Sequence, residues 1–284
     1  MNTQFSTSQW MTATPGIDVL SLMELSLPGT HNAGSDWKAS YPLFGAPRHW
    51  IACQHDSFYH QLHHGARALD IRFIYEPEAE GLGKFRVHHG GSRNSRTLGH
   101  LVTDVNDFLR KNPDEFIVLD FHSLDGTDFD FAYFNQMIIH FLGERIIPRQ
   151  NRYMTLAQLK NISPKQRILV AAESRALDGN VFIDRVVHKW SGQTFIDTTE
   201  LGQFIGEVME NPPSKWGLWS LSATSYTALI GPKDIHTELD KWFDPNTSDW
   251  AQRCNIINVD FIEESRIVDF CHTANLNKAR QRSA

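Results

Sequence analysis

Three short segments carry side chains whose types and spacing suit acid-base chemistry. His31 follows the apolar run 22–27 and the dipeptide Pro28-Gly29, which we expect to end a strand. Asp70 and Arg72 lie two residues apart in a second expected strand, 66–73, so their side chains share one face. His89 ends a third expected strand, 85–89, directly before two glycines. A lone histidine at a strand end is usually structural, but three such segments in series favour a site.

Two histidines and an arginine can together cleave a phosphodiester through an internal hydroxyl. One imidazole takes the proton of the attacking hydroxyl, and the other protonates the leaving oxygen. The guanidinium supplies positive charge where the phosphoryl oxygens gain negative charge. The residue types therefore point to phosphoryl-transfer chemistry.

The motifs Leu27–Asn32, Gly65–Arg72 and His88-His89-Gly90, in this order, resemble a known family. They are similar to the catalytic X region of the phosphatidylinositol-specific phospholipases C, above all to its bacterial and short single-domain members. The resemblance covers roughly the first half of the chain and continues more loosely to Asp260.

This resemblance implies a role for each matched residue. His31 would be the general base on the inositol 2-hydroxyl, and His89 the general acid toward the glycerol oxygen. Arg72 falls where the metal-independent bacterial enzymes hold an arginine, and a guanidinium clamps phosphate oxygens in place of a divalent ion. Asp70 would orient or polarise this pair. We therefore expect a site without metal or other cofactor.

Two further residues match the family's pattern differently. Asn32 departs from the bacterial pattern, which has aspartate there, and follows the calcium-dependent branch. Calcium at Asn32 and Asp70 is therefore the less favoured alternative. Asp260 resembles the aspartate of the family's closing motif, which hydrogen-bonds the base histidine and fixes its tautomer. A cap on the following helix is the competing role for Asp260.

Three polar residues that end expected strands would contact the inositol hydroxyls: His122, Glu173 and Asp197. Side chains that donate or accept several hydrogen bonds suit a polyol. The aromatic residue that stacks on the ring in bacterial relatives is replaced here by Thr199. Substrate identity is therefore the least constrained implication of the resemblance.

The pattern of the whole chain predicts an α/β fold. About eight apolar strands alternate with helical segments, among them helices 98–109, 131–142 and 181–190 and a short strand 194–196. In such a barrel the catalytic side chains gather where strands end. We expect a single distorted (β/α)8 TIM-type barrel over residues 1–284, with residues 1–18 as an N-terminal extension.

Composition limits the partners and the compartment. The formal charge of −6 and the pI near 6.1 argue against nucleic acid as a partner. The segment 1–18 lacks the pattern of a secretory signal, and no run approaches the ~20 apolar residues of a membrane span. Cys53, Cys254 and Cys271 lack metal-ligand spacing, so we expect buried thiols. We expect a cytoplasmic protein, with export without a cleaved signal left open.

Other functions fit the same residues. A metal-dependent glycerophosphodiester-type phosphodiesterase would need His-Arg-Gly after the first strand and an acidic pair on the second. The chain has His31-Asn32 and Asp70-Arg72 there, which disfavours that type. A catalytically inactive barrel that binds a phosphorylated ligand stays open, as does a phosphodiester substrate other than a membrane lipid. For a phospholipid substrate we expect at most transient membrane contact.

Overall fold

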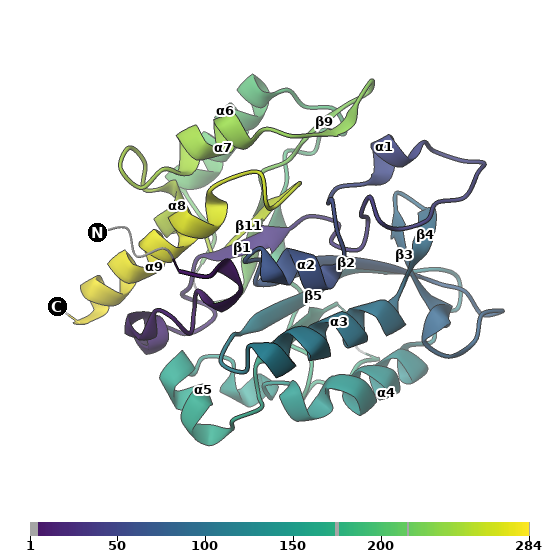
Figure 1. Ribbon diagram of the computed structural model, residues 1–284, viewed down its shortest axis with the longest axis horizontal. Coiled ribbons are helices and arrows are strands. Elements are labelled where there is room, and N and C mark those ends of the chain that lie inside the picture. Colours follow the sequence, from purple (N-terminus) through teal and green to yellow (C-terminus); the bar gives the residue numbers. More distant parts are fainter. Residues whose placement is uncertain (1–4, 174–175, 215, 284) are drawn as a thin grey trace.

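A curled sheet of parallel strands forms the centre of the computed structural model, which describes residues 5–173, 176–214 and 216–283 (Figure 1). Its main sheet has nine strands, of which β3 and β4 run antiparallel to their neighbours. The parallel strands follow one another in the spatial order β6 (Ile168–Ala172), β5 (Ile117–Asp125), β2 (Ala68–Tyr75), β1 (Leu27–Thr30), β11 (Ile256–Val259), β8 (Trp219–Ser222) and β7 (Val187–Lys189). The α/β class expected from the sequence is confirmed.

Helices surround this sheet on its outer side (Figure 1). The longest ones follow the expected pattern of strand and helix in alternation, and α4 has the bounds expected for it. The helices are α1 (Arg48–Ile51), α2 (Phe58–His63), α3 (Leu98–Lys111), α4 (Phe131–Leu142), α5 (Leu156–Ile162), α6 (Thr198–Glu210), α7 (His236–Phe243), α8 (Trp250–Arg253) and α9 (Ile267–Ser283). In α3, Leu101, Val105 and Phe108 recur at helical spacing and are fully buried, so the apolar face faces the core.

The expected strand end at Pro28-Gly29 is wrong, because both residues lie inside β1. Pro28 contributes only its carbonyl, which accepts a hydrogen bond from Arg67 N. A Cβ atom on Gly29 would lie 2.2 Å from Asn258 Oδ1 on the neighbouring β11. Glycine is therefore required by the close approach of two strands, and the dipeptide does not mark a turn.

The expected third strand is present but does not belong to the parallel barrel. β3 (Phe85–His89) pairs antiparallel with β2 and continues into β4 (Ser92–Thr97), which the sequence analysis did not predict. Gly90 and Gly91 connect the two strands with φ angles of 55° and 84°. Such a two-residue turn needs positive φ at both positions, which glycine adopts without strain. His89 therefore stands at the tip of a hairpin.

The expected helix 181–190 is also wrong. Phe182, Ile183 and Val186 are buried at a spacing compatible with a helix, but the backbone there is extended. Ile183 bridges Ala171 in a parallel pair, and β7 then pairs with β8. The expected strand 194–196 is reduced to one antiparallel bridge between Ile196 and Tyr226. Pairing with neighbouring strands here outweighs local helical periodicity.

The described part of the N-terminal segment covers the end of the barrel away from the carboxyl ends of β1 and β11. Trp10 in this segment is fully buried. Arg67 binds Glu115 with an Nη2–Oε2 distance of 2.6 Å, and both side chains are inaccessible to solvent. Arg67 also donates to Ser8 O, and Glu115 accepts from Thr12 N at 2.7 Å. A buried, fully hydrogen-bonded ion pair thus ties this segment to the barrel.

Candidate active site

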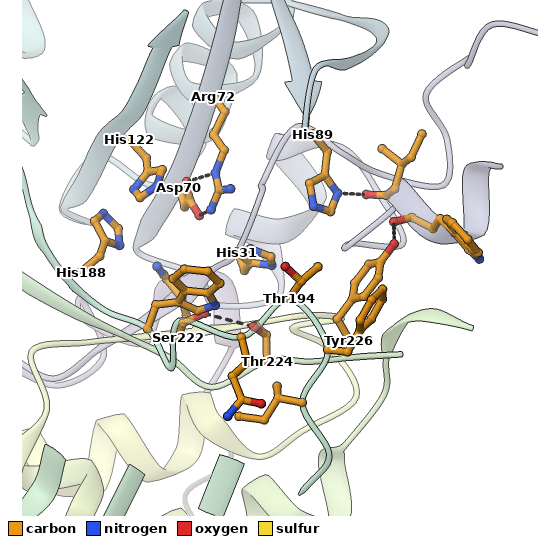
Figure 2. Close-up of a pocket in the computed structure, with 18 of the residues that line it drawn as sticks. His31, Asp70, Arg72, His89, His122, His188, Thr194, Ser222, Thr224 and Tyr226 are labelled. Carbon is orange, nitrogen blue, oxygen red and sulfur yellow. Dashed lines mark hydrogen bonds and ion pairs between the residues drawn. The ribbon is translucent and has the colours of Figure 1, made fainter. Parts of the chain in front are cut away.

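A pocket of about 710 Å³ lies at the carboxyl ends of β1, β2 and β11. This volume is within the range of small-molecule sites. Most of the residues expected to do chemistry line it: His31, Asp70, Arg72, His89 and His122 (Figure 2). The structure therefore brings together side chains that are far apart in the chain.

His31 and Asp260 are held by two neighbouring barrel strands. His31 follows β1, and its main-chain N–H donates to Val259 O at the end of β11. His31 Nδ1 lies 2.8 Å from Oδ1 of Asp260, whose side chain is only 4% exposed. Burial raises the pKa of Asp260, and the adjacent His31 partly opposes this rise. With Nδ1–H donating to Asp260, Nε2 is left as the basic atom of the ring.

Asn32 is buried beside both catalytic candidates of the first two strands. Its main-chain N–H donates to Asp70 Oδ2 at 3.3 Å, and its Nδ2 lies 3.2 Å from His31 Nε2. The φ angle of 45° places Asn32 in the left-handed region, which asparagine tolerates better than most residues. Asn32 Oδ1 is buried and has no partner among the described residues. Asn32 therefore contacts the nitrogen that would act as base.

Asp70 and Arg72 form a bidentate ion pair on β2. Arg72 Nε donates to Oδ1 at 3.1 Å, and Nη2 donates to Oδ2 at 2.8 Å. Burial would raise the pKa of Asp70, but Arg72 and nearby histidines hold it well below its usual range. A register shift between Ile71 and Arg72 in the pairing of β2 with β5 accompanies this geometry. Both oxygens of Asp70 are thus engaged by a guanidinium, where a calcium ion would need them.

His89 reaches the pocket from the tip of the β3–β4 hairpin. Its ring centroid lies 6.1 Å from that of His31, and the rings are nearly perpendicular at 85°. Nδ1–H donates to Ile51 O at 2.9 Å, and Cys53 Sγ lies 3.8 Å from the same nitrogen. Burial, His31 and Arg72 lower the pKa of His89 to about 4. The ring therefore turns Nε2 toward the pocket in a neutral state at pH 7.

His122 lies at the end of the pocket opposite His89, next to a histidine that the sequence analysis missed (Figure 2). The ring centroids of His122 and His188 are 4.0 Å apart and the rings are nearly perpendicular. His188 Nε2 lies 2.9 Å from Asp120 Oδ2. Partial loss of hydration in the pocket, opposed by Asp70, lowers the pKa of His122 to about 4. His188 was missed because it was assigned to a helix, whereas it lies on β7.

The structure does not bring Glu173 and Asp197 into this pocket. Glu173 is exposed at the end of β6 and pairs with Arg185 at 2.6 Å. Asp197 is the exposed N-cap of α6, and its Oδ1 accepts from Thr199 N and Glu200 N. An N-cap aspartate satisfies free amides of the first helical turn. For Asp197 the difference follows from the chain between 181 and 196, which folds differently from the expected helix and strand. Glu173 follows β6 as expected, but its ion pair with Arg185 keeps it out of this pocket.

Residues that follow β7, end β8 or lie on the short strand β9 (Ser225–Thr227) complete the pocket wall. Tyr226 lies with its ring 6.4 Å from that of His89, and its hydroxyl donates to Trp50 O at 2.9 Å. Further lining residues are Trp190, Thr194, Phe195, Ser222 and Thr224. Their position depends on loop paths, so strand patterns gave no signal for them. Aromatic side chains therefore line the pocket, although Thr199, which replaces the aromatic residue of the bacterial relatives, is not among the lining residues.

The three cysteines are buried and unpaired, as expected. Cys53 lies under the pocket, where its Sγ is within 3.7 Å of Asn32 Nδ2. Burial and Asp260 raise the pKa of Cys53 well above its ordinary value. Cys53 therefore remains a thiol and is not a nucleophile here.

No helix of the residues that the structure describes has both the length and the apolar character needed to cross a bilayer.

Two curated proteins are similar to parts of this chain, a phosphatidylinositol phosphodiesterase and a phospholipase C. The chain is 28% identical over 176 residues to the 1-phosphatidylinositol phosphodiesterase of Listeria monocytogenes, an alignment that covers 60% of this chain and 50% of that protein. It is 34% identical over 131 residues to the variant-surface-glycoprotein phospholipase C of Trypanosoma cruzi, covering 44% of this chain and 33% of that protein. The chain thus matches half or less of the length of these curated relatives. No family model matches the chain.

Solved structures match over nearly the whole chain. A phosphatidylinositol-specific phospholipase C variant from Staphylococcus aureus aligns with a TM-score of 0.71 and 17% identity, covering 93% of this chain and 98% of its own. The phosphatidylinositol-specific phospholipase C from Listeria monocytogenes gives 0.69 and 22%, covering 95% and 99%. The TIM-type barrel fold is confirmed.

Proposed function

We propose that this chain, whose relatives and fold are those of phosphatidylinositol-specific phospholipases C, cleaves a phosphatidylinositol-like phosphodiester to a cyclic inositol phosphate. One observation carries the proposal. His31, backed by Asp260, faces His89 across a ring separation of 6.1 Å, with the Asp70–Arg72 pair beside them (Figure 2). A base, an acid and a fixed positive charge thus converge on one pocket.

The geometry supports an intramolecular displacement. His31 Nε2 takes the proton of the inositol 2-hydroxyl, and that oxygen forms a bond to phosphorus. The bond from phosphorus to the glycerol oxygen breaks, and His89 Nε2–H gives its proton to the departing oxygen. Asp260 stabilises the imidazolium that forms on His31. Arg72 donates to the phosphoryl oxygens while Asp70 keeps its guanidinium in place.

His89 acquires its proton as the substrate binds. In the free protein burial, His31 and Arg72 keep its pKa at about 4, so the ring is neutral near pH 7. An anionic phosphodiester next to the ring favours the protonated form and raises this pKa. The general acid is therefore charged mainly in the complex with substrate.

The proposed reaction needs no metal ion. Arg72 occupies both oxygens of Asp70, so the residues of the calcium alternative, Asn32 and Asp70, do not fit a calcium ion in this arrangement. Calcium takes six to eight oxygen ligands, and a guanidinium at this point repels it. Among the structural neighbours, an enzyme from Pseudomonas is described as calcium-dependent, at a TM-score of 0.51 and 13% identity.

The pocket rim suits transient contact with a phospholipid surface. Large apolar side chains are exposed on the loops around the pocket, including Leu43 at 97%, Phe44 at 92%, Trp190 at 56% and Phe195 at 54%. Trp190 and Phe195 also line the pocket itself. Exposed apolar clusters of this kind favour a lipid or protein surface as partner.

Phosphorus NMR of the protein with phosphatidylinositol in mixed micelles tests the reaction, once with excess chelator and once with calcium. We expect a cyclic inositol phosphate signal that grows equally in both. Growth with calcium alone would restore the calcium alternative. Absence of product in both would contradict the proposal and favour a pocket that binds a phosphorylated ligand without turnover.

A further inference from the structure

A second group of metal-ligating side chains lies at the pocket end opposite His89. Asp120 and His122 belong to β5, and His188 belongs to β7. Figure 2 shows the rings of His122 and His188 next to each other. One ligand atom of each residue lies within 4.8 Å of the other two. The proposed proton transfers use none of the three, although His122 is also expected to contact the inositol hydroxyls, and His122 and His188 line the pocket.

The inner part of this cluster is buried and pre-oriented. The side chain of Asp120 is 4% exposed and that of His188 is 20% exposed. His188 Nδ1 lies 2.7 Å from Ser220 Oγ, a partner on the neighbouring β8. A hydrogen bond at one ring nitrogen fixes the ring and leaves the other nitrogen for a ligand bond.

Nε2, the other ring nitrogen of His188, lies beside the carboxylate of Asp120 but does not form a hydrogen bond of good geometry with it. His188 Nε2 is buried and has no hydrogen-bond partner of good geometry among the described residues, although Asp120 Oδ2 lies 2.9 Å away. The cluster therefore holds a buried imidazole nitrogen next to a buried carboxylate oxygen.

We infer that Asp120, His122 and His188 form a binding site for a divalent transition-metal ion of the zinc class. Two imidazole nitrogens and one carboxylate oxygen suit zinc, whereas calcium and magnesium prefer oxygen ligands alone. Tetrahedral zinc holds such atoms about 3.3 Å apart. The present separations lie within 4.8 Å, so small side-chain rotations close the site.

This ion would lie apart from the position proposed for the phosphate. Asp70 and Arg72 stand between the cluster and His89, and their ion pair stays intact (Figure 2). Zinc binds an unprotonated imidazole nitrogen and a carboxylate, so protons compete with it for the site. Metal affinity is therefore expected to fall as the pH is lowered. The inference does not depend on the proposed reaction.

Zinc titration of chelator-treated, full-length protein against a chromogenic zinc chelator tests the site at neutral pH. We expect one equivalent of zinc bound, with His122→Ala and His188→Ala each weakening binding by roughly 10-fold or more. His122 is exposed, so its replacement is expected to preserve the fold, which circular dichroism checks. Unchanged zinc affinity in folded His122→Ala would overturn the inference.

Two control variants separate this site from the other candidate clusters. His31, Cys53 and Asp260 form one, and His55, Glu263 and Glu264 form another. Cys53→Ser and His55→Ala should leave zinc affinity unchanged, and loss of binding in either would place the ion elsewhere. Cobalt(II) gives a second readout. We expect a visible spectrum of nitrogen and oxygen ligands, and a thiolate charge-transfer band would contradict the inference.

Discussion

Arg72 donates hydrogen bonds to both carboxylate oxygens of Asp70, two residues away on the same strand. The Nε–Oδ1 distance is 3.1 Å and the Nη2–Oδ2 distance is 2.8 Å. The guanidinium side chain is 21% exposed, so its remaining N–H groups are accessible from the pocket. The ion pair thus fixes the orientation of the Arg72 guanidinium and leaves other N–H groups accessible to a ligand in the pocket.

Arg72→Lys should lower turnover by roughly 100-fold. Lysine keeps the positive charge but cannot hold Asp70 bidentately while donating to a phosphoryl oxygen. Steady-state rates with phosphatidylinositol micelles measure the effect, and the surface variant Arg110→Lys serves as the matched control. Equal rates for both variants would show that Arg72 does not stabilise the transition state.

His31→Ala and His89→Ala should each lower turnover by roughly 100-fold or more while the fold is retained. The two rings lie in one pocket, where each would make one of the two proton transfers. Turnover and circular dichroism are to be measured together, with His63→Ala as control. A folded variant with a near-native rate would remove that histidine from the mechanism.

Stability should fall as the pH is lowered from about 6.5 toward 4. Burial, His31 and Arg72 depress the pKa of His89 to about 4 in the folded protein. The unfolded chain, with an ordinary histidine pKa of about 6.5, binds more protons in this interval. Urea unfolding at several pH values should show this loss, and His89→Gln should make it smaller. An identical pH dependence in the variant would contradict the assignment.

Glu115→Ala should destabilise the fold by about 3–5 kcal/mol, because it leaves the buried charge of Arg67 unpaired. Both side chains are inaccessible to solvent. Denaturant unfolding measures the change, with the exposed Glu144→Ala as control. The rate per folded molecule should stay the same, since the ion pair lies away from the pocket. A loss near that of the control would mean that the pair contributes little.

Leu43→Ser combined with Phe44→Ser should weaken binding to phosphatidylinositol vesicles by roughly 10-fold. Each residue is more than nine-tenths exposed, and removing apolar side chains from a lipid contact costs binding free energy. Vesicle sedimentation measures binding, and the exposed Ile162→Ser is the control. Hydrolysis of a water-soluble substrate should not change. Undiminished sedimentation would exclude this loop from membrane contact.

The sequence predicted well those features that depend on local pattern. The helix α4 and the strand β2 follow from periodicity and capping. His31, Asp70, Arg72 and His89 lie in one pocket because motifs at strand ends converge in a barrel. Asp260 contacts His31 for the same reason.

The remaining features depend on contacts that no local pattern encodes. In the sequence, Gly29 predicts the end of a strand. In the structure it lies inside β1, because Asn258, on a strand more than two hundred residues later, leaves no room for a side chain there. His188 lies in a segment whose buried residues have helical spacing, but the segment forms strand β7 because it pairs with β8. Asp197 was placed in the site through that same segment, whereas Glu173 follows β6 as expected but pairs with Arg185 instead of entering the pocket. Tertiary pairing therefore decided each of these errors.

The position of the β3–β4 hairpin determines how the protein would lose activity as it begins to unfold. The proposed base, His31, follows the parallel strand β1, and Arg72 lies on the parallel strand β2, whereas His89 ends β3, which pairs antiparallel with β2. Edge hairpins open at lower free energy than a barrel core. His89, the proposed acid, can thus move out of the pocket with the hairpin while the rest of the molecule stays folded. Catalytic competence would then report the opening of one hairpin, and it would disappear before the barrel melts.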